Sequence, residues 1–392
     1  MAKFSPRWAN RKRNGPAGKD SKANCIIRYN DKRAWLRSRL IRICLVLGGS
    51  TCFVAVSLQI LEIWYRLSIL SEPVESPSQL GKDDMYTVSI ISQNKRWGVL
   101  EKILKHYNTC PKVQSISVVW DGSTVPLLGA YSASKINISF RNAFKKDSLN
   151  NRFFRDATIG TEAVLSVDDD LLVSCNDVLR AFAQWKESGK DQLVGFLPRL
   201  VVHQGSSMDS NGISDAIDSE SERKMRYLSE KEAIHYNKYN VILTPLMVYH
   251  AKYMELYWSD EYTKEREFVD SMSNCEDLLM NYIVSYYHFM ARGEKGSHAR
   301  FLQPRRRLDI SRLSSCGVSC GNLHLNKRQK CAEYFEASFR SRSLSTSSDN
   351  STSIKGNEGS RWNGLVSSNF SFKKSFFARP VCWIPGLGCI YH

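Results

Sequence analysis

The sequence has few acidic residues for its size. It contains 39 Asp and Glu against 55 Lys and Arg in 392 residues, which gives a formal net charge of +16. The shortage is greatest at the start, because residues 1–42 contain 13 basic and 2 acidic side chains. The other 350 residues carry a net charge of only +5. Composition therefore gives no support to a uniformly basic fold that coats a polyanion.

No internal repeat is visible along the chain, and its composition is not that of a disordered protein. The sequence is 42% hydrophobic, 11% aromatic and 24% charged, which suits a packed globular core. A chain of 392 residues allows two or three average domains, or one larger domain with appendages.

Charge is missing from one long stretch, residues 43–61, which directly follows the basic leader. About twenty apolar residues span a bilayer as a helix. Trp64 and Tyr65 stand where interfacial aromatic residues are expected. The basic side of such a helix stays in the cytosol. We therefore predict a cytosolic leader over residues 1–42, a transmembrane signal anchor over 43–65 and a short stem over 66–84. A signal peptide and a buried soluble helix are the alternatives.

Two features fit a luminal position for the part that follows. The sequons at Asn137, Asn350 and Asn369 are usable only in a luminal segment. An oxidising compartment permits disulfides among eight cysteines beyond the anchor, which are Cys110, Cys175, Cys275, Cys316, Cys320, Cys331, Cys382 and Cys389. A zinc site is the alternative for Cys316 and Cys320, whose C-x3-C spacing is a weak signal by itself.

Residues 85–338 alternate between strand-like and helix-like patterns. Apolar, β-rich runs at 86–91, 115–120, 163–167 and 193–197 predict strands, while 99–107 and 177–186 predict helices. Continuous apolar strands between helices indicate an α/β domain with a mostly parallel sheet. Residues 204–232 are polar and predict a mobile loop. The Ser-rich residues 339–392 predict a tail that is disordered for most of its length.

Three adjacent carboxylates, Asp168, Asp169 and Asp170, follow the predicted strand 163–167. Such groups repel one another unless a cation offsets the cost, and hard carboxylate oxygens suit Mn²⁺ or Mg²⁺. In open α/β sheets, ligands bind beyond the carboxyl ends of strands. A solvated acidic turn or a helix cap is the competing interpretation.

Other polar groups accompany the triplet. Asn151 and Arg152 precede it, Glu276 and Asp277 begin an apolar helical pattern, and Arg328 lies in a late basic cluster. The planar guanidinium of arginine suits phosphate or a nucleotide base. Taken separately, each group is better explained as a helix cap or a solvated charged face.

Together these segments resemble glycosyltransferase family 64, the exostosin-like transferases, and most closely its plant members. The resemblance covers about 250 residues from 85 to about 336. It is carried, in family order, by Lys95-Arg96, SVVW at 117–120, DSLNNRF at 147–153, VLSVDDD at 164–170, VGFLPR at 194–199, NCED at 274–277 and KRQKC at 327–331.

The resemblance implies a GT-A fold, a nucleotide-sugar donor and a role for each matching residue. It implies that Arg96, Asn151 and Arg152 hold the nucleotide and that Asp168 and Asp169 contact the ribose and donor sugar. Glu276 is then a further residue that binds the nucleotide sugar, and Asp170 ligates Mn²⁺ or Mg²⁺. It places Asp277 beside the anomeric carbon and Arg328 at the departing phosphate or the sugar, and it implies a Cys275–Cys331 disulfide.

The resemblance also implies an activity and a location. It implies retaining transfer of N-acetylglucosamine or mannose from a UDP- or GDP-sugar in the Golgi membrane. The acceptor is then a glycan or a glycosyl inositol phosphorylceramide.

Two alternatives remain at this stage. Asn94 and Gly98 depart from the family pattern around Arg96, as does the ending of the chain, which motivates a catalytically silent luminal scaffold that acts as a binding protein. The basic leader motivates a membrane-tethered binder of nucleic acid or anionic lipid. The silent scaffold would keep the fold but show no turnover. The membrane-tethered binder would lose its polyanion binding when residues 1–42 are removed.

Overall fold

The computed structural model of the chain describes most of residues 84–349 and a few positions outside them. The described residues are 57, 60, 84–93, 96–121, 136–209, 212–214, 224–305, 307–309, 323–349, 362, 364, 365, 370 and 371. The predicted leader and the stem up to residue 83 lie outside them, as do Lys95, Cys316, Cys320, Asn350 and Asn369, and almost all of the predicted anchor. No helix within the described ranges is long and apolar enough to span a bilayer.

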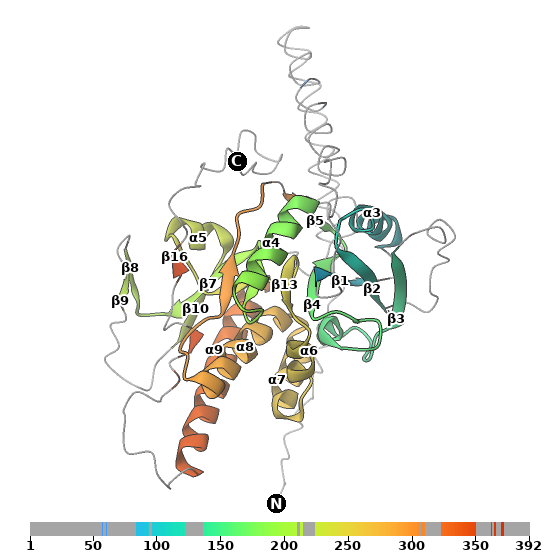
Figure 1. Cartoon of the computed structure of the whole chain (residues 1–392). Helices are drawn as coiled ribbons and strands as arrows, with labels where there is room; N and C mark the ends of the chain where they lie inside the picture. Colours follow the sequence, from blue (N-terminus) through green and yellow to red (C-terminus); the bar gives the residue numbers. More distant parts are fainter. Residues whose placement is uncertain are drawn as a thin grey trace, which may run out of the picture.

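A seven-stranded sheet forms the centre of the domain, in the order β14-β6-β13-β4-β1-β2-β3 (Figure 1). Six of its strands run parallel: β1 (Tyr86–Gln93), β2 (Val113–Asp121), β3 (Asn137–Asn142), β4 (Ala163–Asp168), β6 (Leu193–Gly195) and β14 (Ala299–Phe301). β13 (Met247–His250) is antiparallel to both β4 and β6. The α/β class with a mostly parallel sheet is confirmed.

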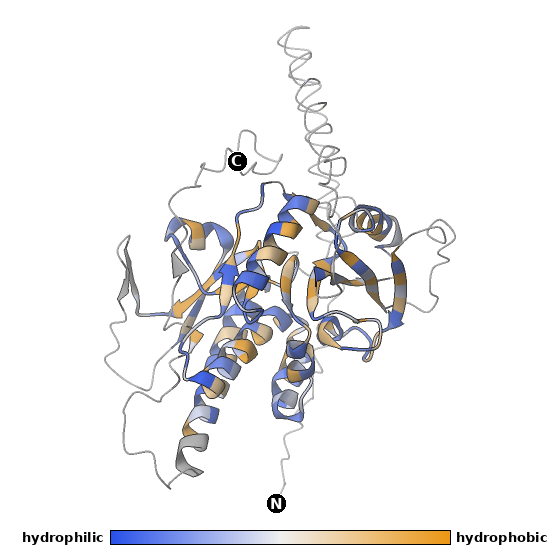
Figure 2. Ribbon diagram, in the orientation of Figure 1, coloured by the Kyte–Doolittle hydropathy of each residue, from blue (hydrophilic) through white to orange (hydrophobic). Residues whose placement is uncertain are grey.

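Helices cover both faces of this sheet, because successive strand side chains point to opposite sides. In β4, Ala163, Leu165 and Val167 pack with α3 (Trp97–Tyr107) and α4 (Cys175–Glu187), whereas Val164 packs with the opposite layer. That layer contains α6 (Lys252–Tyr257), α7 (Thr263–Met272), α8 (Glu276–Arg292) and α9 (Leu323–Asp349). Figure 2 shows the resulting concentration of hydrophobic residues along the central strands. The continuous apolar runs of the sequence are thus strands buried on both faces.

The predicted elements appear close to the expected places. The runs at 86–91, 115–120 and 163–167 lie in β1, β2 and β4, and the two predicted helices lie in α3 and α4. The run at 193–197 begins with β6 and extends two residues beyond it. Ser174 caps α4 by accepting from the Asp177 amide, which fixes where that helix begins. The sequence therefore determined these elements locally, through apolar patterning and polar caps.

The predicted mobile loop at 204–232 is wrong for most of its described part. Residues 224–232 form β10 (Met225–Leu228) and the start of α5 (Glu230–His235), and β8 (Ser207–Asp209) pairs with β9 (Gly212–Ser214). β10 lies in a small sheet with β7 (Pro198–His203) and β12 (Val241–Ile242). A capping box at Ser229 and Glu232 starts α5.

Three shorter elements complete the domain. β5 (Leu171–Val173) pairs with β15 (Arg307–Asp309), and β11 (Lys238–Tyr239) pairs with β16 (Phe370–Ser371). The 3₁₀ helices η4 (Leu149–Phe153) and η5 (Asp260–Tyr262) lie in the loops before β4 and α7.

The prediction that disorder begins at residue 339 is corrected by the described part of the tail. α9 continues to Asp349, and Phe339 is buried. Trp362 and Leu365 are buried as well, and Trp362 lies 6.0 Å from Tyr282 and 5.8 Å from Tyr286 between ring centroids. The Ser-rich composition concealed a few large apolar residues that complete the core around α8.

Candidate active site

The first half of the candidate site lies where the chain leaves β1 and β4. Asp168 is the last residue of β4 and pairs with Ile91 of β1 in the sheet register, and Arg96 comes soon after β1 ends. The chain continues from β1 to β2 on one side, whereas β4 lies on the other. Such a switch point, at the carboxyl ends of parallel strands, is the usual ligand site of open α/β sheets.

Arg96 holds two of the three aspartates. Its Nη1 lies 2.7 Å from Asp169 Oδ1, and its Nη2 contacts Asp170 Oδ2. Ser92 at the end of β1 donates its hydroxyl to Asp169 at 2.5 Å. The structure therefore brings together Arg96, Asp169 and Asp170, three of the residues to which the resemblance gave a role.

The triplet is short of positive charge. Burial, partly offset by Arg96, raises the pKa of Asp169 to about 7, and burial with the neighbouring Asp168 charge raises the pKa of Asp170. Raised carboxylate pKa values in a cluster mean that a further cation is favoured there. The donors are oxygens only, which fits Mn²⁺ or Mg²⁺.

Arg152 connects this cluster with the second half of the site. It is buried on η4, its Nη2 lies 2.5 Å from Asp168 Oδ1, and its Nε lies 3.4 Å from Glu276 Oε1. It also donates to Ser166 Oγ at 3.3 Å. One guanidinium therefore joins a strand-end aspartate to the first residue of α8.

Asn151 lies next to Arg152, but its side chain does not face the acidic groups. Its amide accepts from the Lys145 backbone at 3.0 Å and donates to the carbonyls of Lys145 and Ser148. The side chain thus closes the loop that carries η4. The predicted nucleotide contact of Asn151 stays a prediction, and the observed geometry gives it a positioning role.

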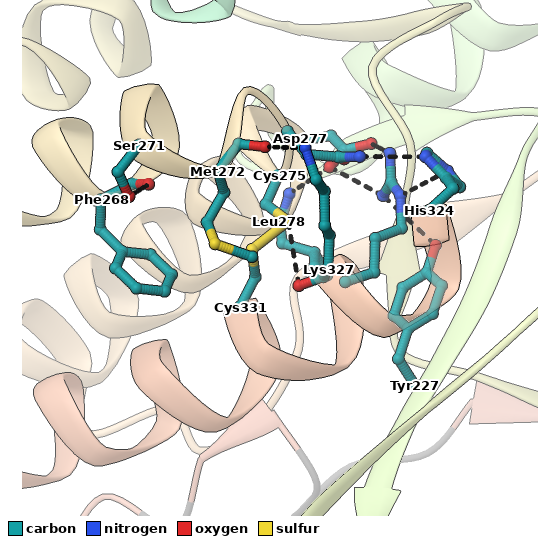
Figure 3. Close-up of a disulfide and its surroundings, with 12 residues drawn as sticks. Tyr227, Phe268, Ser271, Met272, Cys275, Asp277, Leu278, His324, Lys327 and Cys331 are labelled. Atoms are coloured by element: carbon teal, nitrogen blue, oxygen red, sulfur yellow. Dashed lines mark hydrogen bonds and ion pairs between the residues drawn. A yellow bond between two sulfur atoms is a disulfide. The ribbon is translucent and has the colours of Figure 1, made fainter. Parts of the chain in front are cut away.

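The second half of the site is a buried pair between Asp277 and Arg328. Two parallel contacts of 3.0 and 2.9 Å join the guanidinium Nη atoms to the carboxylate oxygens. Figure 3 shows Asp277, His324 and Tyr227 converging on this position. Arg328 Nε donates to His324 Nε2 at 3.1 Å, and Nη1 donates to the Tyr227 hydroxyl at 3.3 Å. A bidentate pair of this kind fixes orientation as well as charge.

A disulfide between Cys275 and Cys331 holds α8 against α9, as the resemblance implied (Figure 3). Cys331 lies one helical turn beyond Arg328, and Cys275 directly precedes Glu276. Cys275 has φ of 81° and Ser273 has φ of 47°, which is an uncommon conformation for residues other than glycine. The cross-link therefore constrains the strained approach to α8 and keeps Asp277 facing Arg328.

The pKa values of the two adjacent acids at the start of α8 shift in opposite directions. Burial, with the charge of Asp277, raises the pKa of Glu276 to about 7. Burial also opposes ionisation of Asp277, but the bidentate contact with Arg328 outweighs it and lowers the pKa of Asp277. At neutral pH, Asp277 is thus a carboxylate and Glu276 is partly protonated.

Sequence reasoning missed three residues of the site. Ser92 holds Asp169, Tyr227 lies in the segment that was predicted to be a loop, and His324 bridges Arg328 and the Asn274 side chain. Burial beside Arg328 lowers the pKa of His324 to about 4, so it is neutral at pH 7. Its spacing of four residues from Arg328 on one helix is the signal that would have revealed it.

The structure also shows the surroundings of Gly98 and of the Asn137 sequon. Gly98, which departs from the family pattern, is exposed on α3 with open space around its Cα, so the helix forms regardless. Asn137 begins the edge strand β3 and is exposed, which leaves its sequon accessible.

A second disulfide, Cys110–Cys175, joins the end of α3 to the start of α4.

Comparison with known proteins gives a single family. A model described as the glycosyl transferase family 64 domain matches residues 86–354. Glucosamine inositolphosphorylceramide transferase 1 of Arabidopsis thaliana is 32% identical over 259 residues, which are 65% of this chain and 30% of that protein.

Two other relatives match over larger shares of their own length. Glycosylinositol phosphorylceramide mannosyl transferase 1 of Arabidopsis thaliana is 28% identical over 70% of this chain and 77% of its own. Human exostosin-like 2 is 29% identical over 52% of this chain and 59% of its own. The chain matches about a third of the length of the first plant relative.

Proposed function

Because the chain belongs to glycosyl transferase family 64, we propose that it transfers a sugar from a nucleotide-sugar donor. The fold we propose for residues 85–338 is the GT-A fold of such enzymes. The strands that run parallel, with one antiparallel strand beside β4, are consistent with it.

The observation that carries the proposal is the bridge made by Arg152. It links Asp168, at the end of β4, to Glu276, next to Asp277 at the start of α8. The two acidic clusters come from segments more than a hundred residues apart in the sequence. A structural ion pair alone has no need of five carboxylates in three neighbouring groups of ion pairs. A site that must hold a divalent cation for a diphosphate and surround a reacting sugar with acceptors has such a need.

The chain's own residues divide this work. Arg96 and Arg152 present guanidinium groups where a diphosphate and ribose would lie, and Asp168 and Asp169 offer acceptors for sugar hydroxyls. Asp277 is held ionised by Arg328, so a carboxylate is ready to stabilise positive charge at the anomeric carbon. Arg328 is positioned to stabilise the negative charge of the leaving phosphate.

Asp170 is the residue we assign to Mn²⁺ or Mg²⁺, with Asp168 beside it. The cluster fits such an ion because its carboxylates are crowded, partly buried and rich in oxygen donors. When bound, the ion supplies electrostatic stabilisation of the leaving diphosphate.

The donor, acceptor and location follow from the relatives as proposals. We assign a retaining transfer of N-acetylglucosamine or mannose to a glycan or glycosyl inositol phosphorylceramide, because two plant relatives, at 32% and 28% identity, are named for that lipid. A luminal domain on a single-pass Golgi anchor accords with the two disulfides.

The test is turnover of a panel of UDP- and GDP-sugars by the full chain in detergent, with Mn²⁺ and inositol phosphorylceramide acceptors. Asp170→Ala and Asp277→Asn are the site variants. Glu162→Ala is the matched control, because this carboxylate is exposed and pairs with Lys190 at the surface. We expect loss of turnover in the first two and normal turnover in the third. Absence of turnover with every donor, or equal turnover in all variants, contradicts the proposal.

A further inference from the structure

A second group of metal-ligating side chains lies at the other end of α8. His288 belongs to the last turns of the helix, and Glu294 and His298 follow in the loop that leads to β14. One ligand atom from each lies within 4.8 Å of the other two. The Glu294 carboxylate oxygen Oε2 is 3.7 Å from His288 Nδ1 and 3.5 Å from His298 Nε2.

These separations match the needs of a small tetrahedral ion. Zinc bonds of about 2.0–2.1 Å in tetrahedral geometry separate neighbouring ligand atoms by about 3.4 Å. The two imidazole rings lie face to face with centroids 4.0 Å apart, and Glu294 reaches between their nitrogens. Because an imidazole lone pair lies in the plane of its ring, the loop side must adjust: the His298 ring turns out of this stack so that both nitrogens and the Glu294 carboxylate point at one ion.

Hydrogen bonding leaves the correct nitrogen of His288 free. The Tyr253 hydroxyl donates its proton to the Asp191 carbonyl at 2.7 Å, so at 2.8 Å from His288 Nε2 it acts as acceptor of the ring N–H. The neutral ring therefore carries its lone pair on Nδ1. This nitrogen is fully buried and has no hydrogen-bond partner. Metal-ligating histidines are commonly fixed through the other ring nitrogen in this way.

Charge around the group does not oppose a cation. Arg292 Nη1 lies 3.8 Å from Glu294 Oε1, but Arg292 and Lys252 are each paired with Asp191, at 2.6 and 2.7 Å. The Glu294 side chain is 44% exposed, so an ion can enter and water can complete its coordination.

We propose that His288, Glu294 and His298 form a second metal site, which binds Zn²⁺ in preference to Mn²⁺. Two imidazole nitrogens and one carboxylate are a zinc ligand set, and nitrogen-rich sites bind Mn²⁺ most weakly among the divalent first-row metals. The oxygen-only cluster at Asp170 has the opposite preference. This site is independent of sugar transfer, and an ion there ties the end of α8 to the edge strand β14.

The test compares zinc binding by the untagged full chain with that of two variants. His298→Gln removes one ligand, and Glu294→Gln removes another at an exposed position that tolerates substitution. His235→Gln is the matched control, because His235 is exposed on α5. Each protein is stripped with EDTA and dialysed against Zn²⁺ or Mn²⁺. Bound metal per chain and the melting temperature are then measured.

We expect the wild type and the His235 variant to bind one zinc equivalent more than either ligand variant. We also expect zinc to raise the melting temperature of these two proteins by about 5 °C more than that of the ligand variants. The difference between variants excludes zinc held elsewhere in the chain, including at Cys316 and Cys320. Equal zinc content in all four proteins overturns the proposal, as does an equal loss in the His235 variant. Because metal content and melting temperature do not depend on turnover, failure here is distinct from failure of the proposed function.

Discussion

Arg328 and Asp277 are both buried, so each depends on the other for its charge to be tolerated. Their side chains are 9% and 1% exposed. Removing one member of a buried pair leaves an uncompensated charge, which is more costly than removing both. A single and a double substitution at this pair should therefore differ in stability while both lose turnover.

We predict that Asp277→Asn lowers the free energy of unfolding by about 3–5 kcal/mol, because Arg328 loses its counter-charge. Adding Arg328→Met should recover most of that stability without recovering turnover. We expect at least about 100-fold lower kcat in both variants. Chemical denaturation and initial rates check the two halves. A single variant as stable as the wild type would mean that the pair is not desolvated.

Glu276 gives the domain a pH dependence that can be measured without substrate. Its pKa is raised from the ordinary value of 4.5 to about 7 by burial and by the charge of Asp277. Between these two pH values the folded state binds more protons than the unfolded state. The free energy of unfolding therefore falls as pH rises through this window.

We predict that Glu276→Gln removes up to about 3 kcal/mol of this decline between pH 4.5 and 7. Denaturation of both proteins in EDTA checks it, since Asp169 titrates in the same range in both and cancels in the difference. Identical slopes for the two proteins contradict the predicted environment of Glu276.

At the scale of single residues, the sequence predicted those site residues that stand out by their immediate neighbours in the chain. Three consecutive aspartates carry a cost that indicates a cation, and Glu276-Asp277 at the start of an apolar pattern indicates a helix start. Tyr227 and Ser92 have no such local signal, because their roles depend on which side chain the fold places opposite them. Asn151 was assigned to the nucleotide by its position in a motif, whereas its amide is used by its own loop.

At the scale of elements, the two disulfides are a natural comparison. They close loops of similar length, with sequence separations of 65 for Cys110–Cys175 and 56 for Cys275–Cys331. Their effects on the unfolded chain are thus nearly equal. Only Cys275 adjoins an acidic residue of the site.

We predict that replacing either pair by alanine lowers the free energy of unfolding by a comparable 2–4 kcal/mol, approximately. Loss of Cys275–Cys331 should also lower kcat/KM by about tenfold or more, since α8 and α9 no longer hold Asp277 against Arg328. Melting curves and steady-state kinetics of the two double variants check this. Equal kinetic losses would contradict the positioning role of the second disulfide.

The packing of Trp362 predicts that the late part of the chain stabilises α8. Its ring lies 5.8 Å from Phe339 and 6.0 Å from Tyr282, and it is fully buried. We predict that Trp362→Ala costs about 3–5 kcal/mol, whereas Phe144→Ala costs less than about 1 kcal/mol. Phe144 is 65% exposed and serves as the matched aromatic control. Denaturation midpoints check both, and similar values for the two variants argue against the packing role.

At the scale of the whole molecule, charge is concentrated in the leader. Residues 1–42 carry a net charge of +11 out of the total of +16. We predict that deleting them moves elution from a heparin column to markedly lower salt, because electrostatic binding to a polyanion scales with the charges neutralised. Unchanged elution would place the polyanion affinity on the remaining 350 residues instead.

The class of the fold could be predicted from the sequence, whereas the full set of strands could not. Apolar strands such as 163–167 and capped helices such as α4 are local signals, so they were predicted correctly. β10 and β16 are short strands whose hydrogen-bond partners lie far along the chain, and the polar residues around them favoured a loop and a tail. Only pairing at long range makes them strands.

The bridge through Arg152 has a consequence for the stoichiometry of protons. Five carboxylates, Asp168, Asp169, Asp170, Glu276 and Asp277, face three guanidinium groups, Arg96, Arg152 and Arg328. If all were ionised, the network would lack two positive charges, which is the charge of one divalent cation. Asp169 and Glu276 have pKa values of about 7, so protons supply part of this deficit at neutral pH. Metal uptake must then release protons to solvent, so the affinity for the ion increases as the medium becomes less acidic.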